Sequence, residues 1–247
     1  MRSAHYKKNV LVTGASRGIG RAIAVGLAED GAEKVGVHYA TNHGAAEHTA
    51  DLVAKAGAKP VLIEAPLDGD GIAAARRIAD AWDGDLDVLV NNAGINGNQP
   101  LGEIDPATYR RVVEVNLTAP LFLIQEFAPR LREGGRVVNI STGYTRVAAP
   151  THPVYAATKA ALNNLGLALA PVFGPRGITI NAVMPGIVDT DINADWLPDN
   201  RESAAALSVF NRVGTVEDIA LVVRHLASDA GRWTTGQVID ATGGSAL

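Results

Sequence analysis

Short apolar runs of strand length recur along the chain, and each is separated from the next by a stretch with helical spacing. Most of these runs are β-branched and continuous rather than alternating, which is typical of strands buried on both faces of a sheet. They predict strands at residues 10–12, 35–39, 60–63, 88–90, 137–140, 179–183 and 238–240.

The intervals between these runs predict helices at residues 21–30, 45–56, 72–82, 106–132, 154–173 and 216–228. Gly31 and Gly57 follow the first two helices, where a glycine cap is expected. Thr215 and Asp218 have the spacing of a capping box before the last helix. Strand alternating with helix predicts right-handed βαβ units. We therefore expect an α/β fold of the Rossmann type, a doubly wound parallel sheet of about seven strands with helices on both faces.

The length of 247 residues suits a single domain, 1–247, that carries both a dinucleotide site and the catalytic residues. Residues 191–211 fit the alternation poorly, because they lie between a predicted strand and the last long helix without a clear pattern of their own. The sequence leaves two interpretations of this segment open: a lid over the site, or a surface connection that contains a short helix.

Composition narrows the class of protein. Hydrophobic residues make up 47% and charged residues 19%, which argues against a disordered or fibrous chain. The formal net charge of −4 argues against nucleic-acid binding. There is no cysteine, and no carboxylate–histidine cluster has the spacing of metal ligands. The apolar stretch 9–13 is too short for a signal peptide, and no run approaches the roughly 20 apolar residues of a membrane span. We expect a soluble, cytoplasmic protein without nucleic-acid, membrane or metal partners.

A glycine-rich turn, TGASRGIG at residues 13–20, lies between the first predicted strand and the first predicted helix. Parallel sheets bind ligands at the carboxyl ends of their strands. A helix N-terminus there presents free N–H groups and a positive dipole end to a pyrophosphate, and glycine lets the backbone approach it closely. The strand–turn–helix context therefore indicates a dinucleotide site rather than an ordinary flexible turn.

The residues after the second predicted strand indicate which dinucleotide is bound. NAD enzymes tend to place an acid on the ribose 2′-hydroxyl about 20 residues after the glycines. Here that region reads Tyr39, Ala40, Thr41 and Asn42, and none of them is acidic. Arg17, inside the turn, offers positive charge to a 2′-phosphate. The sequence favours NADPH/NADP+; the alternative is NADH, with Arg17 merely solvated.

Tyr155 and Lys159 lie four residues apart on a predicted helix and so share one face. A free tyrosine has a pKa of about 10, and a neighbouring cation lowers the pKa of a phenol. A phenol tuned in this way can donate a proton to a carbonyl oxygen as a hydride arrives, or accept one in the reverse reaction. The spacing of Tyr155 and Lys159 alone predicts this chemistry only weakly. The prediction is stronger because the same chain also contains the glycine-rich turn.

These features and three further motifs make the chain resemble the short-chain dehydrogenase/reductase family over nearly its whole length. Within the family it is most similar to 3-oxoacyl-carrier-protein and polyketide-type ketoreductases. The order and spacing of the motifs are more specific than any one of them. They are the turn at 13–20, Asn91-Asn92-Ala93-Gly94, Asn116, the Tyr155–Lys159 pair, and Pro185-Gly186.

The resemblance implies catalytic roles for several of these residues. Tyr155 would be the proton donor, and Lys159 would lower the pKa of Tyr155 and hold the nicotinamide ribose. Asn116 would bend its helix and hold a water linked to Lys159. Relatives carry a serine, usually thirteen residues before the tyrosine; that position is Thr142 here, and Ser141 stands one residue earlier. Adjacent strand residues point in opposite directions, so only one is expected to face Tyr155. We favour Thr142, because its hydroxyl offers the same donor and acceptor as serine.

The resemblance also implies contacts with the cofactor. Asn92, Ala93 and Gly94 would pass the adenosine ribose, Asp68 would bind the adenine amino group, and the segment after Pro185 would flank the nicotinamide. The alternatives are a helix-capping Asn92, a core Asn116, a solvated Asp68 and an ordinary turn at 185–186. The expected cofactor-binding residues are Gly14, Ser16, Arg17, Gly18, Ile19, Gly20, Tyr39, Thr41, Asn42, Asp68, Asn92, Ala93, Gly94, Tyr155, Lys159, Pro185, Gly186, Val188 and Thr190.

The substrate pocket is expected between residues 144–153 and the segment 191–211. Tyr144, Arg146, His152 and Trp196 are candidates for its lining. Arg146 would meet an acidic group of a substrate, or be solvated or paired. His152 would be a second proton relay, or an ordinary polar residue before a helix.

The sequence predicts NADPH-dependent reduction of a small-molecule ketone, of the 3-oxoacyl or polyketide kind, to a secondary alcohol. One alternative is an NAD(P)-dependent alcohol dehydrogenase that works oxidatively. Another is a non-catalytic dinucleotide-binding sensor, against which the intact Tyr155, Lys159 and Asn116 argue. The resemblance implies a homotetramer, or a homodimer, that pairs the helices at 106–132 and 154–173 and the C-terminal residues 238–247.

Overall fold

A parallel β-sheet runs through the middle of the molecule, which the computed structural model describes over residues 8–245. Within that range the sheet has seven strands in the order β3-β2-β1-β4-β5-β6-β7, and every neighbouring pair is parallel. The prediction of a doubly wound Rossmann-type sheet is confirmed. The strands are β1 (Asn9–Val12), β2 (Lys34–Tyr39), β3 (Lys59–Glu64), β4 (Leu86–Asn91), β5 (Leu131–Ile140), β6 (Thr179–Pro185) and β7 (Val238–Ala241).

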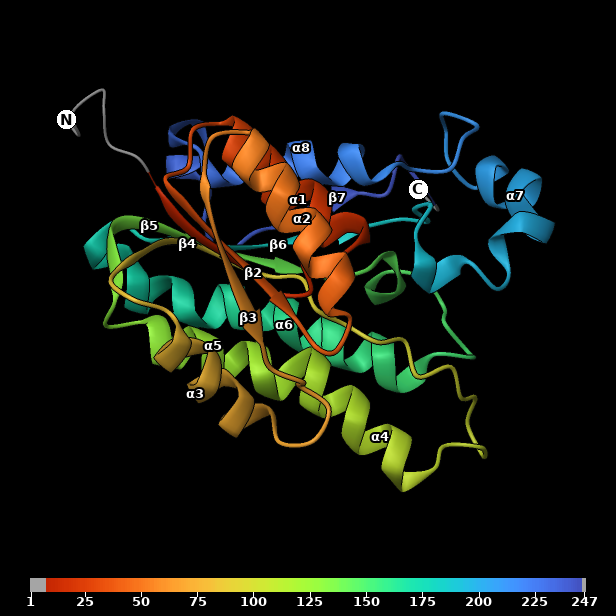
Figure 1. The fold of residues 1–247 in the computed structure, drawn as a ribbon. Helices are drawn as coiled ribbons and strands as arrows, with labels where there is room; N and C mark the ends of the chain where they lie inside the picture. The colour runs from red at the N-terminus through yellow and green to blue at the C-terminus, as the bar shows by residue number, and fades with distance from the viewer. Residues whose placement is uncertain (1–7, 246–247) are drawn as a thin grey trace.

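Helices cover both faces of this sheet (Figure 1). On one face lie α1, α2 and α8; on the other lie α3, α5 and α6, with α4 on the same side. A short helix, α7, stands at the carboxyl edge of the sheet. The helices are α1 (Gly18–Glu29), α2 (His43–Lys55), α3 (Gly71–Ala81), α4 (Pro106–Val113), α5 (Ala119–Phe127), α6 (Pro153–Phe173), α7 (Leu197–Ala206) and α8 (Val216–Ala227).

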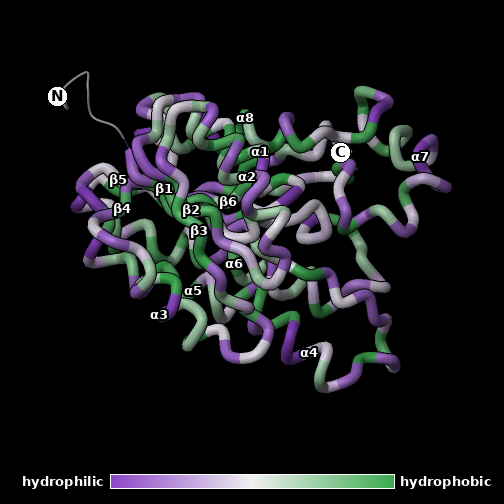
Figure 2. Tube along the Cα trace, in the orientation of Figure 1, coloured by the Kyte–Doolittle hydropathy of each residue, from purple (hydrophilic) through white to green (hydrophobic). Residues whose placement is uncertain are grey.

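Alternate side chains of the strands fill two separate cores. Val10 and Val12 pack with α1 and α8, while Leu11, between them, packs with α3 and α5. The same alternation in β4 sends Val88 to the first core and Leu89 to the second. Apolar segments therefore gather at the sheet and polar ones outside it (Figure 2). Burial on both faces explains why the strands read as continuous apolar runs.

Short polar side chains start several helices where the sequence predicted them. Asn42, Asp70 and Asp105 each accept a hydrogen bond from a backbone N–H in the first turn of the helix that follows. The predicted capping box of Thr215 and Asp218 is present in α8, with both reciprocal bonds formed. Each cap satisfies donors that a helix start otherwise leaves without partners.

The helix predicted at 106–132 is present from Pro106 to Phe127, but it ends earlier than predicted and is not α-helical throughout. The segment forms α4, then a stretch of π-helix at Glu114–Thr118, then α5, and β5 already begins at Leu131. Pro120 supplies the physical reason, because it has no N–H to donate to the carbonyl of Asn116 four residues earlier, and its ring would clash there. The π-helix absorbs this mismatch. The bend at Asn116 that the family resemblance implied is therefore a local π-helix.

The segment 191–211 contains a 3₁₀ turn, Asp191–Asn193, followed by α7. The segment therefore contains a short helix, and both interpretations, a lid over the site and a surface connection, stay predictions. The segment exposes several large apolar side chains to solvent: Ile192, Trp196, Leu207, Val209 and Phe210.

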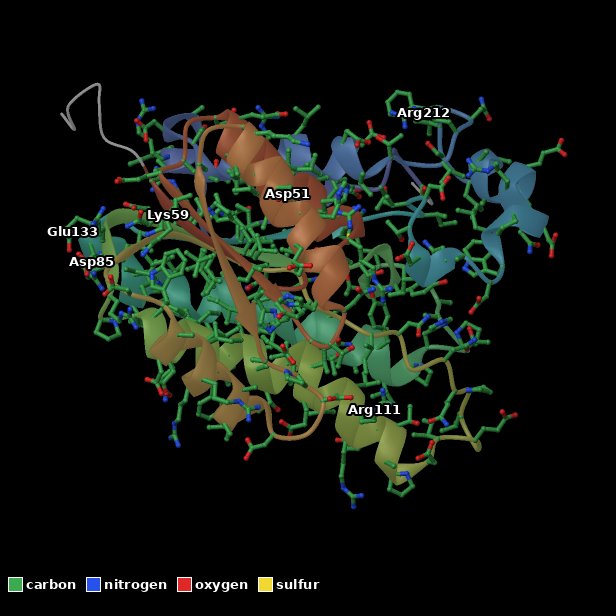
Figure 3. The ribbon with its side chains drawn as sticks, viewed as in Figure 1. Asp51, Lys59, Asp85, Arg111, Glu133 and Arg212 are labelled. Atoms are coloured by element: carbon green, nitrogen blue, oxygen red, sulfur yellow. The ribbon has the colours of Figure 1, made fainter. Side chains whose placement is uncertain are left out.

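The two edges of the sheet differ in chemistry. Ion pairs lie at the amino edge, where Asp85 is 3.3 Å from Arg132 and Glu133 is 3.0 Å from Arg176; Figure 3 shows Asp85 and Glu133 together there. The carboxyl edge carries the glycine-rich turn.

Between residues 8 and 245, none of the helices has the length and apolar character needed to cross a membrane. Within the same range, no three acidic or histidine side chains gather as metal ligands do. Residues 1–7 and 246–247, the latter part of the predicted C-terminal contact, lie outside the described residues.

Candidate functional site

The glycine-rich turn needs its glycines for two different reasons. Gly14 and Gly18 adopt positive φ values of 62° and 55°, which disfavour any side chain. Gly20 has no room, because a Cβ there would lie 2.2 Å from the carbonyl oxygen of Gly14 and 2.5 Å from Asn92 Nδ2. The turn thus presses the start of α1 against the end of β1.

The N-terminus of α1 fits an anionic group. Arg17 occupies the capping position, and its side chain makes no capping hydrogen bond. By contrast, side chains cap α2, α3, α4 and α8. A helix start without a capping side chain keeps its N–H groups for another acceptor, and its dipole favours negative charge. The donor set at Gly18 to Gly20 therefore suits the pyrophosphate of a dinucleotide.

The side chain of His38, on β2, holds the glycine-rich turn in place by hydrogen bonding. Its ring is fully buried; Nδ1 accepts a hydrogen bond of 3.1 Å from the N–H of Gly14, and Nε2 donates one of 2.9 Å to the carbonyl oxygen of Ala65. This arrangement requires the neutral ring, and burial lowers the pKa of His38 to about 4. Sequence analysis missed this residue. The available signal was one histidine inside an otherwise apolar strand.

Asn92 and Thr13 join the turn to the end of β4. The Asn92 amide donates to the carbonyl oxygens of Thr13 and Gly14 at 2.8 and 3.1 Å. The Thr13 hydroxyl in turn accepts from the N–H groups of Asn92 and Ala93 at 2.9 and 3.0 Å. β1 and β4 are the strands between which the strand order reverses. These bonds fix the two chain segments at the crevice where such sheets bind ligands.

Asn116, Gly94 and Lys159 come together behind this crevice. A Cβ on Gly94 would lie 3.2 Å from Lys159 Nζ and 3.3 Å from Asn116 Oδ1, so glycine permits the approach. The Asn116 side chain accepts from the N–H of Ile95 at 3.0 Å and donates to its carbonyl at 2.8 Å. The π-helix is thereby anchored to the loop after β4.

Lys159 is buried, and its ammonium group donates a 2.7 Å hydrogen bond to the carbonyl oxygen of Ile140 at the end of β5. Burial lowers the pKa of Lys159 to about 8. Nζ lies 5.9 Å from the centroid of the Tyr155 ring. The two residues predicted to act together therefore share one face of α6 and lie close together.

Of the two candidate hydroxyls, Thr142 is the one that reaches Tyr155. A hydrogen bond from Thr142 lowers the pKa of the Tyr155 phenol. Ser141 points the other way; it is buried and donates to the carbonyl oxygen of Lys159 at 3.4 Å. The two adjacent residues thus point in opposite directions, as expected from the sequence.

The direction in which the pKa of Tyr155 is shifted corrects one expectation. The sequence predicted that Lys159 would lower the pKa of Tyr155, but burial of the phenol is the largest influence and the net effect raises the pKa. The ammonium of Lys159 is directed to Ile140 instead. Tyr155 is therefore protonated at neutral pH, as a proton donor must be.

The residues expected at the adenosine end are spread along the carboxyl edge of β2 and β3. The side chain of Tyr39 is buried and its hydroxyl contacts His43 and Glu64, so only its backbone is available to a ligand. Thr41 and Asn42 are exposed. Asp68 is half exposed and lies 3.5 Å from Arg111, which projects from α4 in Figure 3.

On the nicotinamide side, the loop after β6 meets the glycine-rich turn. Thr190 lies over Gly18, with its Cγ2 3.6 Å from the position a Cβ would take there. Arg17 Nε is 3.3 Å from a carboxylate oxygen of Asp191, and both side chains are largely exposed. Gly186 is in close contact with Thr242, leaving no room for a Cβ. Ser16 and Ile19 lie in the turn, and Pro185 and Val188 are buried in and beyond the end of β6.

Aromatic rings line the approach to Tyr155. The centroids of Tyr144 and His152 are each 6.4 Å from that of Tyr155 and 5.3 Å from one another. Burial lowers the pKa of His152, so its ring is neutral at pH 7. Arg146 is paired with Asp240 at 2.6 Å, the second of the two interpretations left open for it. Trp196, in the segment before α7, is exposed, and its indole nitrogen donates to Asn193 rather than to this group.

Comparison with known proteins bears on this site. The family model described as enoyl-(acyl carrier protein) reductase matches residues 14–246. Versicolorin reductase of Emericella nidulans is 38% identical, covering 96% of this chain and 95% of its own. A 3-oxoacyl-[acyl-carrier-protein] reductase of Staphylococcus aureus is 36% identical, covering 96% and 97%. The crystal structure of the angucycline C-6 ketoreductase LanV with bound NADP superimposes with a TM-score of 0.88 at 41% identity, covering 96% of this chain and 95% of that one.

The fold and the site define a dinucleotide-binding oxidoreductase with a tyrosine and a lysine on one helix. The chain belongs to the short-chain dehydrogenase/reductase family of NAD(P)-dependent oxidoreductases. The family resemblance drawn from the sequence is thereby confirmed.

The buried His38 makes stability depend on pH. Its ring binds a proton with a pKa of 6.5 when unfolded and about 4 when folded, so the unfolded chain binds more protons between these values. The contribution of His38 to stability is therefore complete above pH 6.5 and falls by about 3 kcal/mol as the pH drops to 4. His38→Asn should remove this part of the pH dependence, measured as the free energy of unfolding in urea at several pH values.

His48, exposed on α2, provides the matched control. His48→Asn should leave the pH dependence of unfolding as in the wild type. Equal slopes for the wild type and His38→Asn between pH 4 and 6.5 would contradict the neutral, turn-supporting role of His38.

Proposed function

We propose that this protein is an NADPH-dependent ketoreductase that converts a small-molecule ketone to a secondary alcohol. The observation that carries the proposal is the placement of Tyr155 and Lys159 on one face of α6, with Lys159 Nζ 5.9 Å from the centroid of the Tyr155 ring and Thr142 beside the phenol. A protonated phenol beside a second hydroxyl is suited to receive a carbonyl oxygen, because both groups can donate a hydrogen bond to it. Tyr155 then transfers its proton to that oxygen as it becomes an alcohol.

The raised pKa of Tyr155 favours reduction over the oxidative alternative. Alcohol oxidation needs a phenolate to accept the proton, and at neutral pH a buried phenol forms little phenolate. A non-catalytic sensor is a poorer fit, because it would not need Thr142, Tyr155 and Lys159 at one place. The ammonium of Lys159, held on the Ile140 carbonyl, faces the region where a ribose would lie.

The residues of the turn fit NADPH, which when bound supplies the hydride. The backbone N–H groups at the start of α1 would hold the pyrophosphate, and Arg17 would face the 2′-phosphate. In the structure Arg17 is paired with Asp191 of the loop after β6, so NADPH binding would exchange this carboxylate for the 2′-phosphate. The solved relative LanV, whose structure contains NADP, supports the same cofactor for this chain.

The aromatic rings beside Tyr155 favour a flat, unsaturated ketone over a flexible chain. Rings such as Tyr144 and His152 interact with other aromatic faces at centroid distances of roughly 4.5–7 Å. A versicolorin reductase and an angucycline C-6 ketoreductase are among the similar proteins. The substrate class we propose is therefore a polycyclic polyketide-like ketone, with 3-oxoacyl thioesters as the second candidate by similarity to the S. aureus reductase.

A homotetramer, or homodimer, remains the expected assembly. Exposed apolar side chains on α6 and around β7 support it: Leu167, Val172, Trp233 and Val238. Trp233 is 95% exposed in the single chain, which is unusual for the largest apolar side chain.

The proposed proton transfer is tested by Tyr155→Phe. Removing the phenolic proton donor should lower kcat for NADPH-dependent ketone reduction by at least about 100-fold. The dissociation constant of NADPH, followed by cofactor fluorescence, should stay within about twofold of the wild type. A panel should include a fused-ring ketone and a 3-oxoacyl thioester. Wild-type turnover by Tyr155→Phe would disprove the role of the phenol.

The assignment of the second hydroxyl is tested by comparing Thr142→Val with Ser141→Ala. Thr142→Val keeps the shape but removes the hydrogen bond to the carbonyl oxygen and to Tyr155, so kcat should fall about tenfold or more. Ser141→Ala should retain most of the activity, since its hydroxyl bonds only to the Lys159 carbonyl. The reverse order of effects in steady-state kinetics would assign the role to Ser141.

The cofactor preference is tested by Arg17→Gln. Loss of a charge-assisted contact to the 2′-phosphate should weaken NADP+ binding about tenfold and leave NAD+ binding nearly unchanged. Titration calorimetry with both dinucleotides measures this ratio. Arg110→Gln, at an exposed position on α4, is the control for a general loss of positive charge. Equal weakening of NAD+ and NADP+ would rule out the 2′-phosphate as the partner of Arg17.

A further inference from the structure

Asn163 lies on the same face of α6 as Tyr155 and Lys159, since the three follow one another at intervals of four residues. Its amide nitrogen donates a 3.1 Å hydrogen bond to the hydroxyl of Thr145. Its amide oxygen is buried and has no hydrogen-bond partner among the described residues. A buried amide with one unsatisfied atom is costly to keep, so its single contact with Thr145 is of interest.

The Thr145 hydroxyl connects Asn163 to Thr142. Thr145 Oγ1 lies 3.0 Å from the carbonyl oxygen of Thr142 and 3.3 Å from Met184 Sδ, neither of which can donate a proton. The single hydroxyl proton of Thr145 must therefore point toward them. Asn163 must then donate to Thr145, and this requirement fixes the orientation of the amide.

The carbonyl that Thr145 holds belongs to the residue that faces Tyr155. Thr142 is in extended conformation, with φ −160° and ψ 151°, at the start of the 3₁₀ turn Gly143–Thr145. A β-branched side chain has few χ1 rotamers, so fixing the backbone of Thr142 also fixes the direction of its hydroxyl. The end of the 3₁₀ turn is therefore bonded to α6 through Thr145 and Asn163. Thr142, just before the turn, directs its hydroxyl toward Tyr155 of the same helix.

We propose that Asn163 is a positioning residue, which acts through Thr145 to hold the Thr142 hydroxyl against the Tyr155 phenol. Asn163 bonds to Thr145 and not to Tyr155, and it is not expected to touch a substrate. The proposal rests on the proposed function in one respect, namely that Thr142 and Tyr155 act on the same carbonyl oxygen.

The expected signature is a change in the ionisation of Tyr155. The hydrogen bond from Thr142 lowers the pKa of Tyr155 and opposes the larger effect of burial. The other titratable groups that face the phenol are Lys159 on α6, His152 at the start of α6 and Tyr144 in the 3₁₀ turn. Lys159 and His152 are not held by Asn163. Loss of the Asn163 contact should therefore raise the pKa of Tyr155 through Thr142.

The experiment compares four variants of the full-length protein. Asn163→Ala and Thr145→Val each remove one link, and kcat for ketone reduction should fall about tenfold in each, which is the effect of about 1.4 kcal/mol. KM for the ketone and the NADPH dissociation constant should stay within about twofold. Thr145→Ser keeps the hydroxyl and should retain wild-type activity. The double variant Asn163→Ala/Thr145→Val should be no worse than either single variant, because both remove one chain of contacts.

Asn164→Ala is the matched control, since Asn164 is the neighbouring asparagine on α6 and is exposed. In this control the activity and the pH profile should equal those of the wild type. In Asn163→Ala and Thr145→Val, ultraviolet difference absorbance should place the ionisation of Tyr155 at higher pH than in the wild type, with Tyr155→Phe as the reference that identifies its signal. The rise of alcohol oxidation with pH should move in the same direction.

Several results would overturn the proposal. One is a kcat for Asn163→Ala equal to that of Asn164→Ala; another is a double variant whose loss is the product of the two single losses. A lowered kcat with an unmoved Tyr155 ionisation would assign Asn163 a general structural role. Failure of the proposed function is distinguishable, because the wild type would then reduce no ketone, while the Tyr155 ionisation still reports on the positioning.

Discussion

The buried ammonium group of Lys159 is the constraint around which the site is organised. A buried charge must be paired with polar groups, and the carbonyl of Ile140 accepts a hydrogen bond from this ammonium. That bond ties α6 to the carboxyl end of β5. Close approach of Gly94 and Asn116 completes the surroundings of the ammonium. Moving α6 away from the end of β5 would leave the charge without this partner, so the helix and the sheet are held in one relative arrangement.

A second set of buried polar contacts holds the opposite half of the site. Asn92 and Thr13 join β4 to the glycine-rich turn, and His38 accepts the N–H of Gly14 from beneath. In both halves, side chains bond to backbone groups at the ends of strands and in the loops that follow them. Loops at the edge of a sheet lack a ladder of their own, and such contacts make them rigid enough to orient a ligand. The proposed role of Asn163 extends the same principle to the turn after β5.

Burial also acts on the protonation of the two residues on α6. The same low-polarity surroundings lower the pKa of Lys159 to about 8 and raise that of Tyr155. From the sequence, the cation alone was expected to act on the phenol, because spacing on a helix says which residues are neighbours and not how deeply they are buried. Desolvation depends on what covers the pair, and here it comes from β4, β5 and the π-helix. The resulting protonated phenol suits a reductase.

The sequence by itself determined the fold and most of the site. Apolar runs bounded by glycine and capping residues specify local structure, and this is why the seven strands, the cap of α8 and the turn at 13–20 lie where they were predicted. The tertiary structure alone decided three things. It placed a π-helix at Asn116, whose side chain bonds to the backbone of Ile95 in the loop after β4. It decided that Thr142 and not Ser141 faces Tyr155, since the orientation of a strand end depends on its pairing with β6. It also determined the contacts of His38 and Asn163, whose partners lie far away along the chain. Long-range contacts of this kind leave no periodic signal in the sequence.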